Sequence, residues 1–283
     1  NVFGIDTPQP EIFEKCTKRL VLSCFEGYNA TVLAYGQTGS GKTYTMGTSQ
    51  RFNVLEEELG IVPRVMGMIF SEIQERKETA QFVVKVSFLE IYNEEIHDLL
   101  ANNVTTDKPI SIREDKGNIM LMGLHEEVVS SYDEMCECLD RGTLKRSTAC
   151  TLMNSTSSRS HAIFTINIEQ QIINPEDESQ EEFMMAKFHF ADLAGSERAK
   201  RTGASGATLK EGININKGLL CLGNVISALT EESKKSNFVP YRDSKLTRIL
   251  QDSLGGNAKT YMIACVSPAE INFEETLNTL KYA

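Results

Sequence analysis

The sequence ATVLAYGQTGSGKT at residues 30–43 decides the fold, because an apolar strand pattern runs directly into a glycine-rich loop. Residues 36–43 match G-x-x-x-x-G-K-[ST], which after a strand is typical of a phosphate-binding loop. Its backbone N–H groups and the N-terminus of the next helix attract an anion. The pattern arises by chance in roughly one chain of this length in a hundred. It therefore predicts a nucleotide site, without indicating which nucleotide or what work is done.

The side chains of this loop have distinct expected roles. Lys42 brings a positive charge to the β- and γ-phosphates, and the Thr43 hydroxyl can ligate Mg²⁺. We expect the whole loop to contact the nucleotide: Gly36, Gln37, Thr38, Gly39, Ser40, Gly41, Lys42 and Thr43.

A second segment, FHFADLAGSE at residues 188–197, resembles the metal-binding strand of such sites. An alternating strand ends at Asp192, whose carboxylate can hold Mg²⁺ directly or through water. Gly195 follows three residues later, and its backbone N–H can bond the γ-phosphate. Glu197 completes the motif.

The hydroxyl-rich segment NSTSSRSHAIF at residues 154–164 supplies groups that hydrolysis needs. Ser157 and Ser158 can reach the γ-phosphate and the metal, Asn154 can position water, and Arg159 can pair with Glu197. A serine-rich surface turn would leave the arginine and the spacing unexplained. His161 is a weaker candidate for a general base because the following strand carries it away, and we expect His189 to be structural.

The remaining pattern predicts one α/β domain with a central, largely buried sheet. Strand candidates alternate with helical periodicity, as in residues 13–24 and 61–73. The strand candidates are residues 82–92, 161–170, 183–194 and 260–268. We interpret the acidic segment 174–182 as a hairpin or loop.

Composition limits the class of protein. Of 283 residues, 41% are hydrophobic and 24% charged, as in ordinary globular domains. Seven scattered cysteines without a secretory signal favour a reducing, intracellular compartment. No apolar run reaches the roughly 20 residues of a membrane span. A net charge of −10 argues against nucleic acid as the main partner.

Four motifs in fixed order make the chain resemble the motor domain of the kinesin superfamily. They are GQTGSGKTYTM (36–46), NSTSSRSHAIF (154–164), DLAGSE (192–197) and VPYRDSKLTRILQDSLGGN (239–257). Within the superfamily, residues 56–65, 88–100 and 110–124 are similar to the kinesin-4, or chromokinesin-like, group.

The resemblance implies a P-loop NTPase fold with an eight-stranded, mostly parallel sheet between two layers of helices, and ATP with Mg²⁺ as ligands. It makes residues 154–161 switch I and residues 192–197 switch II. Ser158 would ligate Mg²⁺, with Asp192 acting through water. Ser157 and Glu197 would order water molecules, Arg159 and Glu197 would form a closing salt bridge, and Tyr44 would lie against adenine.

The resemblance covers residues 1–283 as one motor domain. It implies a first strand before residue 1, a neck linker after residue 283, and dimerisation through a coiled coil outside this sequence. It also implies microtubules as the partner and a cytoplasmic, cytoskeletal location, with the spindle as an option.

An acidic chain and an acidic track require a local basic face. Because salt screens exposed charges beyond about 10 Å, the charge of the contacting patch, and not the net charge of the chain, determines whether the two surfaces attract. Arg242, Lys245 and Arg248 follow at spacings of three, which would align them along one side of a helix. Lys210 and Lys217 would extend this face, near Lys200, Arg201, Lys234 and Lys235.

Two functions remain open from the sequence. One is a microtubule-stimulated ATPase motor, and the other is a slow, nucleotide-gated regulator of microtubule growth with little motility. A P-loop enzyme acting on a small molecule is disfavoured, because nothing in the chain suggests a second substrate pocket.

Overall fold

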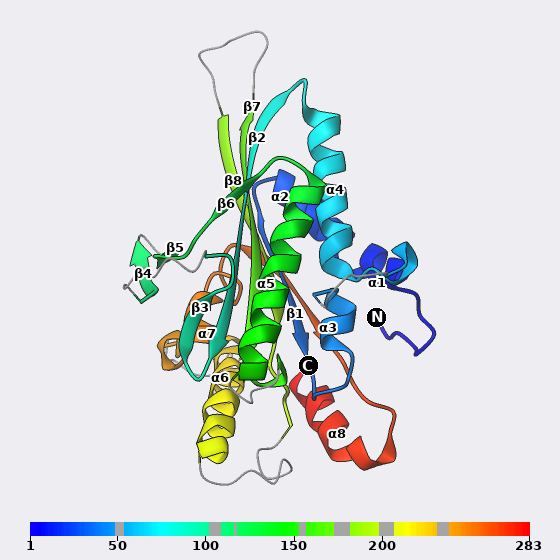
Figure 1. The fold of residues 1–283 in the computed structure, drawn as a ribbon, viewed down its shortest axis with the longest axis vertical. Coiled ribbons are helices and arrows are strands. Elements are labelled where there is room, and N and C mark those ends of the chain that lie inside the picture. Colours follow the sequence, from blue (N-terminus) through cyan, green and yellow to red (C-terminus); the bar gives the residue numbers. More distant parts are fainter. Residues whose placement is uncertain are drawn as a thin grey trace.

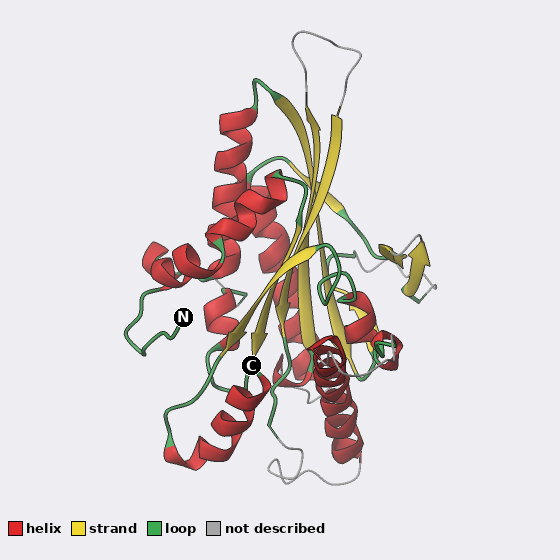
Figure 2. Ribbon diagram, turned by 180° about the vertical axis from the view of Figure 1, so that it is seen from behind, coloured by secondary structure: helices red, strands yellow, loops and turns green. Residues whose placement is uncertain are grey.

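A twisted central sheet divides the molecule into two layers (Figures 1 and 2). The computed structural model describes residues 1–48, 54–101, 109–115, 118–152, 157–172, 182–197, 207–230 and 238–283. The strands are β1 (Asn29–Tyr35), β2 (Ala80–Tyr92), β3 (Glu95–Asp98), β4 (Ser111–Asp115), β5 (Asn118–Met122), β6 (Glu127–Val129), β7 (His161–Ile172), β8 (Glu182–Asp192) and β9 (Ala258–Ala264).

Seven of these strands form the central sheet in the order β3-β2-β7-β8-β1-β9, with β6 beside β2, while β4 and β5 form a separate hairpin. β1 runs parallel to β8 and β9, whereas β2, β3, β6, β7 and β8 pair antiparallel. The α/β fold class is confirmed. The described residues contribute seven strands to the sheet, whose pairing is mixed rather than mostly parallel, because β2, β7 and β8 form a long antiparallel ladder.

The helices are α1 (Gln9–Cys16), α2 (Lys18–Phe25), α3 (Lys42–Met46), α4 (Ile61–Arg76), α5 (Tyr132–Leu152), α6 (Ala207–Thr230), α7 (Lys245–Ile249) and α8 (Phe273–Tyr282). Short 3₁₀ turns occur at Glu56–Glu58 (η1), Ser157–Arg159 (η2), Tyr241–Asp243 (η4) and Glu270–Asn272 (η5). Helices α2, α4 and α5 bury apolar side chains on one sheet face, and α6 and α7 do so on the other.

Local sequence explains the helices that build the first core. Helix α4 contains the helical pattern predicted at residues 61–73: Val62, Met66 and Ile69 are fully buried, and Pro63 occupies the first turn. The helix α5 starts at a capping box, where the Glu134 N–H donates to Ser131 Oγ at 3.2 Å and the Glu134 carboxylate accepts from the Ser130 N–H.

The cysteines contribute to the cores. Cys136 and Cys138 are buried, and neither forms a disulfide. Within the described ranges, no group of three or more His, Cys, Asp or Glu side chains could hold a metal ion.

None of the described helices combines the length and apolar character that a membrane crossing requires. The predicted loop at 174–182 lies almost entirely outside the described residues, but its flanking strands, β7 and β8, are antiparallel neighbours.

Candidate active site

The glycine-rich loop leaves the end of β1 and enters α3, as predicted. Gly39 and Gly41 have φ values of 78° and 98°, in the left-handed region that favours glycine. No described heavy atom lies within 4 Å of where a Cβ of either residue would be. The loop therefore combines the backbone of a phosphate cradle with open space in front of it.

Lys42 lies at the base of this loop with 6% of its surface exposed. Its Nζ donates to the carbonyl oxygens of Gly36 at 2.9 Å and Gln37 at 2.8 Å. Burial lowers the pKa of the ammonium group, while the carboxylates of Asp192 and Glu197 act in the opposite direction. Two neutral carbonyls are weak compensation for a buried cation, so an anion in the loop would be strongly attracted.

Asp192 meets the loop because β8 pairs with β1 in parallel register, which brings the two strand ends to one edge. The Thr43 hydroxyl donates to Asp192 Oδ2 at 2.8 Å. Asp192 Oδ1 is buried and has no hydrogen-bond partner among the described residues. A hydroxyl and an orphaned carboxylate oxygen are the hard ligands that Mg²⁺ and its waters prefer, so this donor set fits the expected metal.

A buried ion network behind Asp192 was missed by sequence reasoning. Arg146, on α5, lies 3.3 Å from Asp192 Oδ2 through Nη1 and 3.4 Å from Glu90 Oε1 through Nε. Its Nη2 donates to the Ser160 carbonyl at 3.0 Å, and Ser160 Oγ donates to Glu90 at 2.5 Å. The single carboxylate of Glu90 inside the apolar run FLEIY was the available signal, because a buried charge needs a partner.

The two predicted switch segments are joined through their backbones. The Gly195 N–H donates to the Ser158 carbonyl at 2.8 Å, and the Ser196 N–H donates to the Gly36 carbonyl at 3.1 Å. In this arrangement Gly195 would have to exchange Ser158 for a γ-phosphate oxygen. Ser158 lies in the 3₁₀ turn η2 with Ser157 and Arg159. The side chain of Ser157 and all of Asn154 lie outside the described residues.

Glu197 contacts the phosphate-binding loop itself. Its Oε2 accepts from the Thr38 N–H at 2.8 Å, and its Oε1 accepts from the Thr38 hydroxyl at 2.5 Å. A Cβ on Gly195 would lie 2.3 Å from Glu197 Oε2, so glycine is needed for this approach. The Arg159–Glu197 salt bridge remains a prediction, and Thr38 is a partner that the sequence did not indicate.

His161 has no free basic nitrogen to serve as a general base. It is buried, and its Nδ1 accepts from the Ala194 N–H at 3.1 Å, which places the proton of the neutral ring on Nε2. Burial and the cations Arg146 and Lys42 lower its pKa to about 3. The expected structural role of His189 agrees with its bond to Thr165 on β7, at 2.9 Å.

Tyr44 projects from α3 beside the loop and is 59% exposed. An exposed aromatic ring at this position is compatible with stacking on a base. Its predicted contact with adenine remains a prediction.

The predicted basic face differs from the expected continuous helix. Arg242 lies in η4, Ser244 is extended and accepts from the Thr247 N–H at 3.1 Å, and only then does α7 begin. The prediction that three cations follow one helix is therefore wrong, because an N-cap interrupts the run.

The cations of this face have unequal surroundings. The Arg242 side chain is 74% exposed and lies 3.1 Å from Glu114 of β4, whereas Arg248 has a buried Nε without a partner among the described residues. Lys245 is half-buried, and Lys217 is exposed on α6, which packs against η4 and α7. The Lys210 side chain and all of Lys200, Arg201, Lys234 and Lys235 lie outside the described part of the chain.

Comparison with known proteins gives one consistent family. The model of the kinesin motor domain matches residues 1–283. Chromosome-associated kinesin KIF4 of Gallus gallus is 57% identical over 284 residues, covering 100% of this chain and 23% of that protein. Kinesin-like protein KIN-4A of Gossypium hirsutum is 54% identical over 310 residues, covering 100% and 30%.

Kinesin-like protein KIF21A of Homo sapiens is 52% identical over 312 residues, covering 100% of this chain and 19% of that protein. A solved structure, "Structure of a fast kinesin: Implications for ATPase mechanism and interactions with microtubules", superposes with a TM-score of 0.90 at 43% identity, covering 100% of this chain and 77% of that one. The chain thus spans less than a third of the length of these curated relatives, and the resemblance to kinesins, including the kinesin-4 group, is confirmed.

Proposed function

The chain belongs to the kinesin motor-domain family, and is thereby an ATP hydrolase domain, and we propose that it couples ATP hydrolysis to movement along microtubules. The alternative, a slow regulator of microtubule growth, uses the same site. Motor domains of this family bind nucleotide with Mg²⁺, and the family is associated with the cytoskeleton.

One observation carries the proposal: three loops meet at one edge of the sheet through direct bonds. Thr43 of the phosphate-binding loop bonds Asp192, Ser196 bonds Gly36, and Gly195 bonds Ser158. A group that binds between these loops must act on both switches together. Such coupling is what a mechanical ATPase requires and a simple nucleotide-binding protein does not.

We assign the following roles within this arrangement. Lys42 would bind the β- and γ-phosphates, and Thr43, Ser158 and, through water, Asp192 would hold Mg²⁺. When bound, the metal neutralises phosphate charge and orients the triphosphate. Ser157 and Glu197 would order the attacking water molecule and the water molecule that accepts its proton.

The network around Arg146 supports the site from behind. Arg146, on α5, bonds the Asp192 carboxylate and the Ser160 backbone. Arg146 therefore acts as a positioning residue that keeps the start of β7 and the end of β8 in register.

The proposed partner is the microtubule, bound through the face of α6, η4 and α7. Switch II leads in sequence into α6, so a change at Gly195 can reach this face. We also propose that the full-length protein dimerises through a coiled coil outside residues 1–283 and acts on cytoskeletal, including spindle, microtubules.

The test is a surface assay with the full-length protein. The motor proposal predicts that surface-bound protein moves microtubules when MgATP is present and stops when MgADP replaces it. Growth of microtubule plus ends is measured in parallel. Altered growth without any gliding would support the regulator. If the protein causes neither gliding nor altered growth, both proposals are refuted.

A further inference from the structure

The turn between β2 and β3 has an unusual backbone. Two residues, Asn93 and Glu94, connect the strands, and their φ values of 52° and 62° lie in the left-handed region. In the described part of the chain, they are the only residues other than glycine with a positive φ. Turns of this kind favour Asn followed by glycine, because glycine has no Cβ to strain. A glutamate at the glycine position therefore suggests that its side chain has a role.

The carboxylate of Glu94 joins this turn to the start of α7. Its Oε2 accepts from the backbone N–H of Lys245, the first residue of α7, at 3.0 Å. Its Oε1 lies beside α6, since a Cβ placed on Gly218 would be 3.9 Å from this oxygen and 3.9 Å from Leu246 Cδ2 of α7. The half-buried Glu94 thus reaches from the sheet to the point where α6 and α7 meet (Figure 1).

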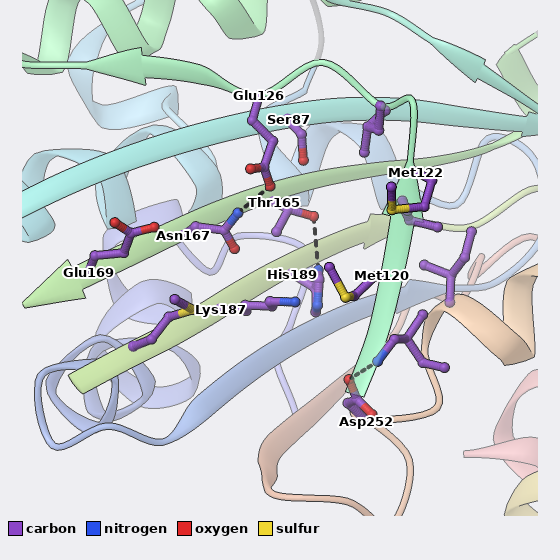
Figure 3. A pocket seen from close by; sticks show the side chains of 15 residues that line it. Ser87, Met120, Met122, Glu126, Thr165, Asn167, Glu169, Lys187, His189 and Asp252 are labelled. Atoms are coloured by element: carbon purple, nitrogen blue, oxygen red, sulfur yellow. Dashed lines mark hydrogen bonds between the residues drawn. The ribbon is translucent and has the colours of Figure 1, made fainter. Parts of the chain in front are cut away.

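The other end of α7 borders open space. Ile249, the last residue of the helix, and Asp252, in the turn that follows, line a cavity of about 280 Å³ between the sheet and the β4–β5 hairpin (Figure 3). Asp252 Oδ2 accepts from the Ile119 N–H of β5 at 3.4 Å, which is a long hydrogen bond. Of these two bonds to the ends of the α7 segment, the one from Glu94 is the shorter.

The negative charge of Glu94 lies on the face that is predicted to bind an acidic track. Lys245 and Arg248 belong to α7, and Lys217 belongs to α6. A carboxylate among these cations lowers their attraction for an acidic surface. Its bond to Lys245, by contrast, holds the helix that carries two of them. The charge and the bond therefore have opposite expected effects on track binding, and variants can separate them.

We propose that Glu94 is a positioning residue for track binding, because its bond to the Lys245 N–H sets how α7 presents its cations. The inference rests on the proposed function, in which the track is the microtubule. The bond outweighs the charge, so a neutral side chain that keeps an acceptor oxygen preserves the role.

Two variants of Glu94 separate the bond from the charge. Glu94→Gln removes the charge and keeps a carbonyl oxygen as the acceptor, whereas Glu94→Gly removes both and relieves the strained backbone. Glu95→Gln is the matched control, because it removes an equal charge from the next residue, whose carboxylate lies 3.9 Å from His97 Nε2. The ATPase rate of the full-length protein is measured against microtubule concentration, together with the melting temperature.

Glu94→Gly should raise the microtubule concentration for half-maximal ATPase about threefold, as expected for one hydrogen bond lost at the start of a helix. The rate at saturating microtubules and the rate without microtubules should stay the same. The melting temperature should not fall, because relief of the backbone strain offsets the lost bond. Glu94→Gln and Glu95→Gln should keep or lower the wild-type microtubule requirement, since both reduce negative charge and keep the acceptor of Lys245.

A second measurement needs no microtubules. Hydrogen exchange of the Lys245 amide, resolved to single residues by mass spectrometry with excess MgADP present, should be about tenfold faster in Glu94→Gly than in the wild type. It should stay near the wild-type rate in Glu94→Gln. The amides of Val65 and Met66, in α4 on the opposite sheet face, should not change. Unchanged exchange of Lys245 in Glu94→Gly would overturn the anchoring of α7 itself.

The ATPase titration also has outcomes that would overturn the proposal. If Glu94→Gly and Glu94→Gln change the microtubule requirement equally, only the charge of Glu94 matters. If Glu94→Gly lowers the melting temperature or the rate without microtubules, the residue has a merely structural role. A wild-type rate that microtubules do not change would instead overturn the proposed function, and with it the role of Glu94 in track binding, even where Lys245 exchanges as predicted.

Discussion

The nucleotide site and the predicted track-binding face differ in how their residues are held. At the nucleotide site, Lys42, Thr43 and Asp192 are joined to one another or to the loop by bonds of 2.8 to 2.9 Å. On the track face, Arg242 is largely exposed and has one exposed ion pair, with Glu114. One site is preorganised by backbone geometry, and the other consists of side chains on separate elements.

This difference indicates where sequence spacing can be trusted. The glycines of residues 36–43 specify a backbone conformation directly, so the loop adopts it. The spacing of Arg242, Lys245 and Arg248 predicts a common face only if one helix contains them all. Ser244 is the N-cap of α7, so Arg242 lies outside the helix that contains Lys245 and Arg248. We therefore expect substitutions in the first region to affect chemistry strongly and those in the second to act modestly and one by one.

The largest effect is expected for Lys42→Ala. The variant removes a buried ammonium group from the phosphate cradle, and truncating a buried charged partner costs about 4 kcal/mol, roughly a thousandfold in affinity. Calorimetric titration with MgATP measures this loss, and exposed Lys15→Ala is the matched control. Wild-type affinity in Lys42→Ala would refute the assignment of the loop.

Glu197→Ala should bind ATP but slow hydrolysis about a hundredfold or more, because a proton acceptor and the predicted partner of Arg159 are lost. Arg159→Ala should behave similarly, and the double variant should be little worse than either one. Single-turnover hydrolysis measures the rates. Glu197 also bonds Thr38, so Thr38→Val tests whether Thr38 is its functional partner instead. If the effects of Arg159→Ala and Glu197→Ala simply multiply, the two residues do not act as a pair, and Thr38 is the functional partner of Glu197.

On the track face, Arg242→Ala should raise the microtubule concentration for half-maximal ATPase about threefold to tenfold and leave the melting temperature unchanged. Arg248→Ala should instead lower the melting temperature by a few degrees, because its partly buried side chain packs against the domain. ATPase titrations at two salt concentrations, with melting curves, separate these outcomes. Arg19→Ala, exposed on α2, is the control, and equal behaviour of the two arginine variants would contradict the contrast.

Acid should weaken the fold through His161. The unfolded chain binds a proton below pH 6.5, whereas the folded pKa is about 3, so stability falls as the pH falls. Between pH 7 and pH 5 this residue alone should remove about 2 kcal/mol from the free energy of unfolding. Denaturant unfolding across this range should give a shallower pH dependence for His161→Asn than for the wild type. The exposed His97→Asn control should keep the wild-type slope, and an unchanged slope in His161→Asn would contradict the account.

The sequence predicted what depends on local patterning. The strand before Gly36 and the helix at Ile61–Arg76 follow from spacing and residue type within a few positions. The position of Asp192 at the end of a strand was also predicted, because a carboxylate that ends an alternating strand is itself a local pattern.

What the sequence could not give depends on contacts between distant segments. The bonds of Arg146 to Glu90, Ser160 and Asp192 join α5, the start of β7 and two strands. The Thr38–Glu197 contact spans 159 positions, and the cavity beneath β4 and β5 requires three strands and a hairpin to meet. The direction of strand pairing in the long β2-β7-β8 ladder likewise follows from chain connections rather than from any single strand.

The most direct test of the central claim is the steady-state ATPase rate as a function of microtubule concentration, with Lys42→Ala as the inactive reference. The account predicts a slow basal rate that rises to saturation as microtubules are added, and a flat line for Lys42→Ala. A wild-type rate that is the same with and without microtubules would contradict it.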